Sequence, residues 1–151
     1  MKYLYITDSP DIARYVDQCG VDRIFIDLEL LGKVERQGGR DTVISHHQVG
    51  NISRVKEAVQ HAEVLVRLNP LNPESSNEIE AVLDQGADCL MLPMFKSVGD
   101  VEWFCQRVNH RAKVVLLVET VEAMMNLSQI VRVPGVTQIH IGLNDLHLDL
   151  E

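Results

Sequence analysis

The sequence has few cysteines and no long apolar segment. Its three cysteines are Cys19, Cys89 and Cys105, and none lies in a CxxC or CxxH spacing. This pattern favours reduced thiols, as in a cytoplasmic protein, over a disulfide framework or a zinc knuckle. No apolar run approaches the roughly 18 residues of a transmembrane helix, and the N-terminus MKYLYITDSPD lacks the apolar segment of a signal peptide. We therefore expect a cytoplasmic protein with no membrane partner.

Several common functional motifs are also missing. The sequence has no P-loop lysine motif, no G-x-G-x-x-G, no nucleophile elbow and no H-E-x-x-H, which argues against the commonest nucleotide-binding proteins, hydrolases and zinc proteases. Basic residues are outnumbered, with 14 Lys and Arg against 22 Asp and Glu and a formal net charge of -8. Because nucleic-acid binding needs a basic face, we expect no nucleic-acid partner. A small anionic substrate remains compatible, since a few local cations can bind one.

The sequence instead contains short apolar, β-rich runs that alternate with amphipathic stretches. Its 151 residues, 46% of them hydrophobic, suffice for one domain with its own core, which we expect to span 1–151. The predicted strands are Tyr3–Thr7, Arg23–Glu29, Val64–Asn69, Cys89–Pro93, Val114–Thr120 and Gln138–Gly142. The predicted helices are Pro10–Cys19, Asn51–Ala62, Ser75–Gln85, Val98–Asn109 and Val121–Val131. This alternation indicates an α/β protein whose parallel strands are joined by right-handed crossovers.

Two of the helix-to-strand connections look alike. Gly20 and Gly86 stand where a helix commonly ends in a glycine, and each is followed two residues later by an aspartate, Asp22 or Asp88. We predict that these turns are two copies of one joint.

Six strands are compatible with two architectures. They are too few to close an eight-stranded barrel, so one possibility is an incomplete (β/α)8 TIM-type barrel with about six βα units, truncated after the sixth strand. The other possibility is an open, doubly wound sheet of the flavodoxin type. An incomplete barrel has unpaired parallel edges, which favour association. We therefore expect a homo-oligomer, or a chain that is only marginally stable alone.

Polar residues interrupt the apolar strands near their carboxyl ends, where parallel α/β proteins build active sites. Asp27 and Glu29 lie two residues apart and share a face of the second strand. They form either a metal or proton-transfer site or a structural ion-pair site. Arg67 in the third strand must be paired, because its charge cannot be removed. It is a partner of the two acids, a clamp for a carboxylate or enolate oxygen, or both.

Two further carboxylates, Glu119 and Asp145, follow the fifth and sixth predicted strands. Carboxylates at the ends of adjacent parallel strands, with room for water and substrate oxygens, suit an octahedral Mg²⁺ or Mn²⁺. The alternative is that Glu119 caps the next helix and that Asp145 forms an Asx turn. Their occurrence together favours the metal site.

Residues 30–50 form a long, charged connection, and loops of this length are usually functional or disordered. His46 and His47 in this segment are either solvated loop residues or candidates for a catalytic base, since histidine titrates near neutrality. The segment also contains three basic residues that could pair with the acids of the second strand: Lys33, Arg36 and Arg40.

Five segments resemble, in order, the HpcH/HpaI aldolase/citrate lyase family. They read GVDRIFIDLE, VRLNP, GADCLMLPM, LLVETVEAMMNL and IHIGLNDL. The last two are the most specific, with a Glu at the end of one strand and I-G-x-x-D-L about one βα unit later. The resemblance spans nearly the whole chain. It implies a (β/α)8 barrel, usually oligomeric, that uses a divalent metal, and so it favours the incomplete TIM-type barrel here.

The resemblance also implies roles for individual residues. Glu119 and Asp145 match the two metal-binding carboxylates, and Arg67 matches the arginine that stabilises an enolate oxygen. Asp27 and Glu29 match the acidic pair that ends the second strand. In the aldolase branch, a 2-oxo acid such as pyruvate binds the metal, which acts as a Lewis acid while an enolate forms or collapses and a C–C bond is broken or made.

The sequence departs from the family pattern in two places. Leu30 occupies the position where the aldolase branch has its histidine base, which His46 or His47 could replace. The basic residues of the next segment, of which Lys33 and Arg40 are candidates for substrate binding, are similar to the citrate-lyase-like branch, which acts on acyl-CoA thioesters. The family's last two strands are also missing.

These observations together predict a metal-dependent carbon–carbon lyase, an aldolase, that acts on a 2-oxo acid through a metal-bound pyruvate enolate. The alternatives are a citrate-lyase-β-like acyl-CoA lyase and a catalytically inactive truncated barrel that acts as an assembly partner.

Overall fold

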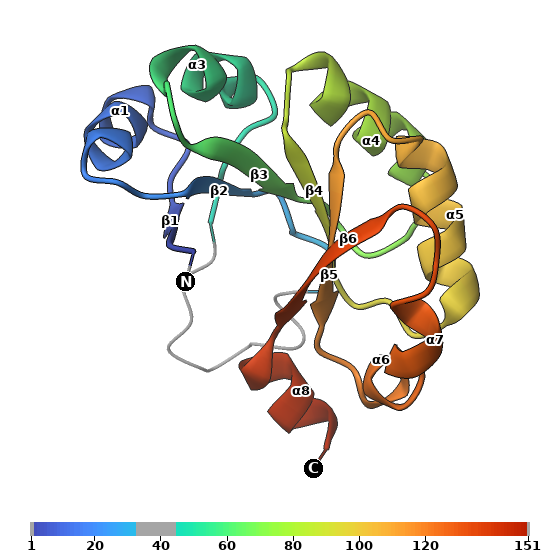
Figure 1. The fold of residues 1–151 in the computed structure, drawn as a ribbon. Coiled ribbons are helices and arrows are strands. Elements are labelled where there is room, and N and C mark those ends of the chain that lie inside the picture. Colours follow the sequence, from blue (N-terminus) through green and yellow to red (C-terminus); the bar gives the residue numbers. More distant parts are fainter. Residues whose placement is uncertain (1, 33–44, 151) are drawn as a thin grey trace.

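Six parallel strands form one sheet in the order β1-β2-β3-β4-β5-β6 (Figure 1). The structure, a computed structural model, describes residues 2–32 and 45–150. The strands are β1 (Leu4–Ile6), β2 (Arg23–Asp27), β3 (Glu63–Arg67), β4 (Cys89–Leu92), β5 (Lys113–Val118) and β6 (Val136–Ile141). The helices are α1 (Pro10–Gln18), α3 (Asn51–Ala58), α4 (Ser75–Asp84), α5 (Val98–Val108), α6 (Val121–Met125), α7 (Leu127–Ile130) and α8 (Leu143–Asp149). Every strand predicted from the sequence is present.

The sheet curls like part of a barrel. The strands follow one another in chain order without reversal, and the helices lie around the outside of the curl (Figure 1). Across the interior, Arg23 Nη1 of β2 donates to Gln138 Oε1 of β6 at 2.5 Å, so the second and sixth strands come within side-chain reach. The incomplete TIM-type barrel is therefore confirmed, and the flavodoxin-type alternative is wrong.

The two faces of the sheet have different neighbours because side chains alternate along each strand. Outward residues such as Ile24 and Ile26 pack beneath the helices in the main core and are fully buried. Inward residues form a smaller apolar cluster in the middle of the barrel, which comprises Leu4, Phe25, Leu65, Cys89, Met91, Val115 and Leu117. β6 differs from the other strands, because its Gln138 and His140 pair in register with Val115 and Leu117 of this cluster.

The two helix-to-strand joints are copies of one another, as predicted. Gly20 and Gly86 have φ values of +88° and +86°, in the left-handed region that glycine adopts without strain. Two residues later, Asp22 and Asp88 each accept a hydrogen bond from the backbone N–H at the start of the preceding strand, at 2.7 and 2.8 Å. Each joint thus ties the new strand to its neighbour at the amino end of the sheet.

Three helices differ from the prediction. α3 ends at Ala58 instead of Ala62, because the backbone of Val59 is extended, with φ -100° and ψ 150°. The helix predicted over Val121–Val131 is divided into α6 and α7 at Asn126, whose backbone lies outside the helical region with φ -93° and ψ 3°. The sequence also gave no expectation of a helix at Leu143–Asp149, where α8 follows β6. Because α8 carries Asp145, it determines where that carboxylate lies.

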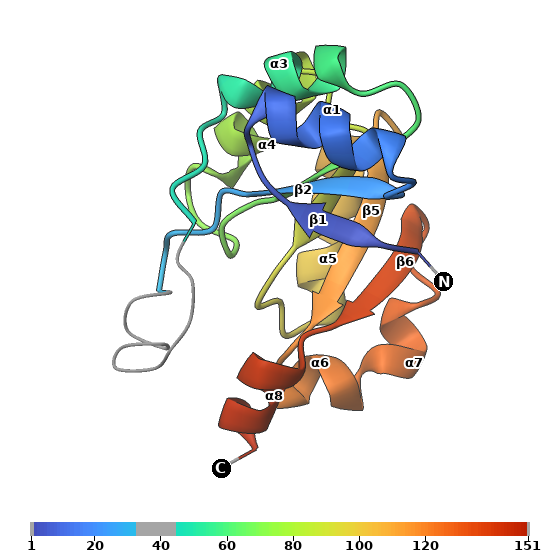
Figure 2. The same ribbon diagram turned by 90° about the vertical axis from the view of Figure 1, so that its left-hand side faces the viewer.

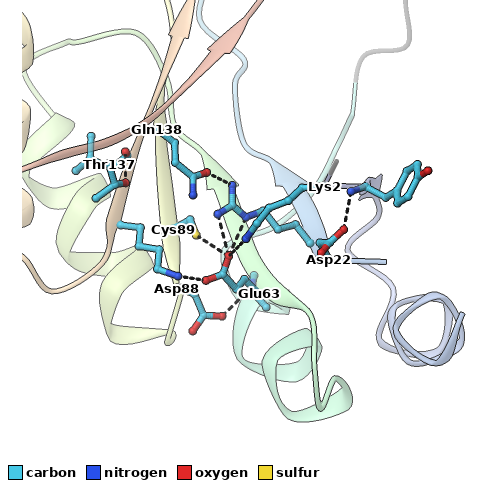
Figure 3. Close-up of polar contacts among 12 residues, drawn as sticks. Lys2, Asp22, Glu63, Asp88, Cys89, Thr137 and Gln138 are labelled. Atoms are coloured by element: carbon cyan, nitrogen blue, oxygen red, sulfur yellow. Dashed lines mark hydrogen bonds and ion pairs between the residues drawn. The ribbon is translucent and has the colours of Figure 1, made fainter. Parts of the chain in front are cut away.

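The amino ends of the strands hold several cations around one carboxylate. Glu63, the first residue of β3, accepts hydrogen bonds from Arg23 Nε and Nη2 at 2.9 and 2.8 Å. It also pairs with Lys113 Nζ, and Lys2 Nζ lies 3.8 Å from its Oε2. Figure 3 shows contacts converging on Glu63, and it also shows Gln138, which accepts from Arg23 Nη1. Each of these cations therefore has a protein carboxylate as its partner.

β1 and β6 are the two outermost strands of the sheet, and Figure 2 shows β1 crossing in front of the sheet, with β6 at its right-hand side. Apolar side chains near these strands are exposed: Tyr3 by 61%, Ile6 by 55%, Ile141 by 59% and Leu143 by 72%. Such edges fit the association that the sequence led us to expect, which stays a prediction. None of the helices in the described ranges is both long and apolar enough to span a bilayer.

Candidate active site

Arg67 holds the acidic pair of the second strand at the carboxyl end of the barrel. Asp27 and Arg67 are partners in the parallel register of β2 and β3, so the two side chains start side by side. Arg67 Nε and Nη2 donate to the two Asp27 oxygens at 2.9 and 2.8 Å, and Nη2 lies 3.3 Å from Glu29 Oε2. Asp27 and Glu29 are 3% and 1% exposed. A bidentate pair of this kind fixes the guanidinium plane.

The charge of Arg67 is maintained despite its surroundings. Burial alone would lower the pKa of Arg67, but the hydrogen bonds and charge of Asp27 and the charges of Glu29 and Glu119 raise it above its ordinary value. The guanidinium carbon also lies 5.5 Å from the centre of the Phe25 ring, a favourable cation–π distance. The site therefore contains a fixed positive charge that does not depend on pH.

Glu119 directly follows β5 and is 2% exposed. Its Oε1 accepts a hydrogen bond from the Met94 backbone N–H at 3.0 Å. Burial raises the pKa of Glu119 to about 7, and the negative charges of Glu29 and Asp145 contribute to the rise. The cap of α6 is Thr120, whose side chain accepts from the Ala123 N–H, so the alternative interpretation of Glu119 as a helix cap is wrong.

Asp145 lies in the first turn of α8 and is 8% exposed. Its Oδ1 is buried and accepts no hydrogen bond from any residue in the described ranges. A buried carboxylate oxygen without a hydrogen-bond partner destabilises the folded protein, and native structures usually provide such an oxygen with a partner. Because Asp145 is part of a helix, the alternative interpretation as an Asx turn is also wrong.

Gly142 brings Glu119 and the start of α8 close together. A Cβ atom at this position would lie 2.8 Å from both Cβ and Oε2 of Glu119, closer than side-chain atoms can approach. The I-G-x-x-D-L segment therefore needs glycine here so that β6 and α8 can pass beside the Glu119 carboxylate.

The donors at this end fit a hard divalent cation. Glu119 and Asp145 provide carboxylate oxygens, one of them without a hydrogen-bond partner in the described part of the chain, and burial, together with the charges of Glu29 and Asp145, raises the pKa of Glu119. Mg²⁺ and Mn²⁺ prefer such oxygen ligands. Among residues 2–32 and 45–150, no three His, Cys, Asp or Glu side chains are grouped tightly enough to hold a metal ion alone. The residues thus suit a metal whose other ligands are water or substrate oxygens.

His47 reaches the same end of the barrel from the segment before α3. Its Nδ1 accepts a hydrogen bond from the Asp27 backbone N–H at 2.9 Å, and its Nε2 lies 3.8 Å from Asp8 Oδ1. The ring therefore connects the end of β2 with the loop that follows β1. His46, in contrast, is exposed.

The remaining residues that the sequence analysis named lie in or next to the segment that follows β2. Lys33, Arg36 and Arg40 lie outside the described residues. Leu30, at the position of the family's histidine base, is 54% exposed, and its backbone N–H is bound by Asn69 Oδ1 at 2.9 Å.

Asn69 is a residue for which the sequence predicted no role in the site. The available signal was its position two residues after Arg67, which places both on one face of the strand and its extension.

The chain is similar to known proteins in both sequence and fold. The sequence matches the HpcH/HpaI aldolase/citrate lyase family over residues 3–151, and none of the curated proteins matches it. Similar solved structures include the citrate synthase SbnG (TM-score 0.76, 20% identity, 99% of this chain and 64% of that chain). They also include an HpcH/HpaI aldolase from Desulfitobacterium hafniense DCB-2 (TM-score 0.70, 20% identity, 99% of this chain and 65% of that chain). A third is macrophomate synthase (TM-score 0.68, 16% identity, 99% of this chain and 57% of that chain).

At these identities the similarity to the solved structures concerns the fold. The chain spans 57–65% of the length of these three proteins. The family match concerns the sequence itself. It covers nearly every residue and includes the segments that carry Arg67, Glu119 and Asp145. The chain belongs to the HpcH/HpaI aldolase/citrate lyase family.

Proposed function

We propose that the protein is a divalent-metal-dependent carbon–carbon lyase that acts on a 2-oxo acid such as pyruvate, in the reversible sense of an aldolase. Membership of an aldolase and citrate lyase family supports lyase chemistry. The observation that carries the finer proposal is the buried Asp145 Oδ1, which lacks a hydrogen-bond partner in the described ranges and lies near a Glu119 carboxyl of raised pKa. A cation held by these two carboxylates relieves both features.

In this proposal Glu119 and Asp145 hold Mg²⁺ or Mn²⁺, which when bound supplies a Lewis acid for the 2-oxo acid. Arg67 supplies the second positive charge. Its Nε and Nη2 are directed at Asp27, so Nη1 is the nitrogen that can donate to the substrate. A fixed guanidinium stabilises an enolate oxygen more than the ground-state carbonyl, because negative charge develops there during the reaction.

The proton transfers need a base that Leu30 cannot provide. In the cleavage direction, a base takes the proton of the substrate hydroxyl, the C–C bond breaks, and its electron pair forms the pyruvate enolate, whose carbon then takes up a proton. His46 and His47 stay our candidates. For His47 the role requires that the ring releases the Asp27 N–H, which Nδ1 binds in this structure.

The remaining expectations belong to the same proposal. We propose that the protein works as a homo-oligomer in the cytoplasm, with a small-molecule 2-oxo acid as its partner and without nucleic acid or membrane. Lys33 and Arg40 stay candidates for binding the substrate's carboxylate, or a CoA group if the acyl-CoA alternative holds.

The test is a cleavage assay with 4-hydroxy-2-oxo acids and with 3-hydroxyacyl-CoA thioesters, in the presence of Mg²⁺ or Mn²⁺. We expect metal-dependent release of pyruvate from the oxo acids and a loss of at least about 100-fold in E119Q. The matched control is E102Q, which changes an exposed Glu on α5. Turnover of the thioesters alone would favour the acyl-CoA lyase. Full activity in E119Q would refute a metal role for Glu119, and no turnover of either class would favour the inactive assembly partner.

A further inference from the structure

Asn69, just beyond β3, holds the backbone that follows Glu29. Its side-chain Oδ1 accepts hydrogen bonds from the Leu30 N–H at 2.9 Å and from the Leu31 N–H at 3.0 Å. These are the first two residues after the acidic pair, beyond the point where the β2–β3 ladder ends. One side-chain oxygen therefore continues the attachment of this segment to the neighbouring strand.

Glu29 lies between two anchored peptide groups as a result. On its N-terminal side, the Leu28 N–H donates to the Arg67 carbonyl at 2.9 Å. On its C-terminal side, Asn69 binds the next two N–H groups. The Glu29 N–H itself donates to Asp27 Oδ1 at 3.1 Å. The backbone at Glu29 is thus fixed on both sides, and its 1%-exposed carboxylate stays 3.3 Å from Arg67 Nη2.

Glu78, in the first turn of α4, fixes the orientation of the Asn69 amide. Its Oε2 accepts from Asn69 Nδ2 at 3.2 Å, and its Oε1 accepts from Asn72 Nδ2 at 3.1 Å. With Nδ2 directed at Glu78, Asn69 must present its oxygen to the two backbone donors. A chain of contacts therefore runs from α4 through Asn69 to the segment next to Glu29.

We infer that Asn69 and Glu78 are positioning residues of the active site, which hold the backbone after Glu29 and so set the place of this carboxylate beside Arg67 and Glu119. The inference rests on the proposed function for the meaning of that placement, because Glu29 matters to catalysis only if the carboxyl end binds metal and substrate. Outer partners of this kind orient the groups that touch the ligand.

A pair of substitutions separates positioning from general stability. N69D keeps the acceptor oxygen but places a second carboxylate against Glu78, so the contact becomes repulsive. N69D/E78Q restores a hydrogen bond between positions 69 and 78. The Gln amide nitrogen can donate to the Asp introduced by N69D, while the Gln oxygen still accepts from Asn72. The control is an equivalent pair on the exposed face of α4, where Asn77 Nδ2 donates to Glu74 Oε2 at 2.8 Å: N77D and N77D/E74Q.

Two measurements are made on each variant. The first is hydrogen exchange of the Leu30 and Leu31 amides in the metal-free protein, where we expect exchange about 10-fold faster in N69D and near wild type in N69D/E78Q. The second is the affinity for Mn²⁺ in the presence of oxalate, which we expect to fall about 10-fold in N69D and to recover in the double variant. Both control variants should resemble the wild type in both measurements.

The outcomes distinguish the two proposals. Unchanged amide exchange in N69D, or no recovery in N69D/E78Q, would overturn the positioning role whatever the metal does. Faster exchange with unchanged Mn²⁺ affinity would also overturn it, since Asn69 would then order the loop without affecting the site. If the wild type binds no Mn²⁺, the proposed function fails, and the exchange data alone decide whether Asn69 holds this segment.

Discussion

The two ends of the same curled sheet carry opposite charge arrangements. At the amino end, one carboxylate, Glu63, is shared by Arg23, Lys113 and Lys2. Burial alone would raise the pKa of Glu63, but the hydrogen bonds from Lys113 and Arg23 lower it to about 2. At the carboxyl end, burial and neighbouring carboxylates instead raise the pKa of Glu119 to about 7.

The difference indicates at which end the charged groups are paired without a bound ligand. The amino end satisfies its charges internally, as a region that contributes to stability does. The carboxyl end places Asp27, Glu29 and Glu119 near Arg67 and Asp145 near Glu119, and it leaves one Asp145 oxygen without a partner in the described ranges. An excess of buried acid destabilises the protein unless a cation binds. We therefore interpret the carboxyl end as a site prepared for a cation.

The largest expected effect follows from removing the Arg67 guanidinium at the carboxyl end. R67M removes the positive charge beside two nearly fully buried acids, and we expect it to lower the free energy of unfolding by about 3–5 kcal/mol. The control is R14M, because Arg14 pairs with Asp11 on the exposed surface and should contribute less than about 1 kcal/mol. Urea denaturation of both variants measures the difference. Equal losses would mean that the buried pair contributes no more than a surface pair.

The pH dependence of stability should have opposite signs at the two ends. The pKa of Glu63 is lowered from 4.5 to about 2, so its contribution is present above pH 4.5 and is lost as the pH falls toward 2. The pKa of Glu119 is raised from 4.5 to about 7, so the metal-free protein loses stability as the pH rises from 4.5 to beyond 7. Each effect amounts to at most about 3 kcal/mol.

Denaturation of the metal-free protein across these two pH ranges tests both signs. E63Q should remove the acid-side dependence and destabilise the protein near neutral pH. E119Q should remove the neutral-range dependence and make the metal-free protein more stable than the wild type above pH 7. A loss of stability in E119Q at that pH would contradict our interpretation that the carboxyl end carries an excess of buried negative charge.

A smaller effect is expected where β6 passes Glu119. G142A places a Cβ atom 2.8 Å from the Glu119 side chain, and overpacking of this kind costs about 1–3 kcal/mol. The control is G50A, because a Cβ at Gly50 meets no atom within 4 Å and its φ of -63° suits alanine. Thermal unfolding compares the two variants. If both are equally stable, the close approach at Gly142 is not a constraint.

The smallest effect concerns His47. H47A removes the acceptor of the Asp27 N–H and should lower the free energy of unfolding by about 1 kcal/mol. H47N, whose side-chain oxygen can accept the same bond, should recover most of that stability, and H46A at an exposed position should have little effect. The turnover of H47N then shows whether His47 also transfers a proton. Wild-type stability in H47A would mean that the ring does not hold Asp27.

The sequence predicted the strands and the principal acids because both depend on local patterns. Apolar runs bounded by glycine and polar residues located all six strands. Period-two alternation placed Asp27 and Arg67 on the inner face, where the register pairs them.

Other features depend on the three-dimensional structure. The helix that carries Asp145 has only 7 residues, which is too short for a periodic pattern to predict it. The contact from Asn69 to two backbone N–H groups joins residues 38 and 39 positions apart, which no local pattern reveals.

The central claim is that Glu119 and Asp145 form a metal site, and titration calorimetry of Mn²⁺ into the protein, with and without oxalate, tests it most directly. We predict saturable binding that tightens with oxalate and disappears in E119Q and D145N. It should persist in the surface controls E102Q and D11N, which change exposed acids. Absence of binding to the wild type, or binding that survives in D145N, would contradict the claim.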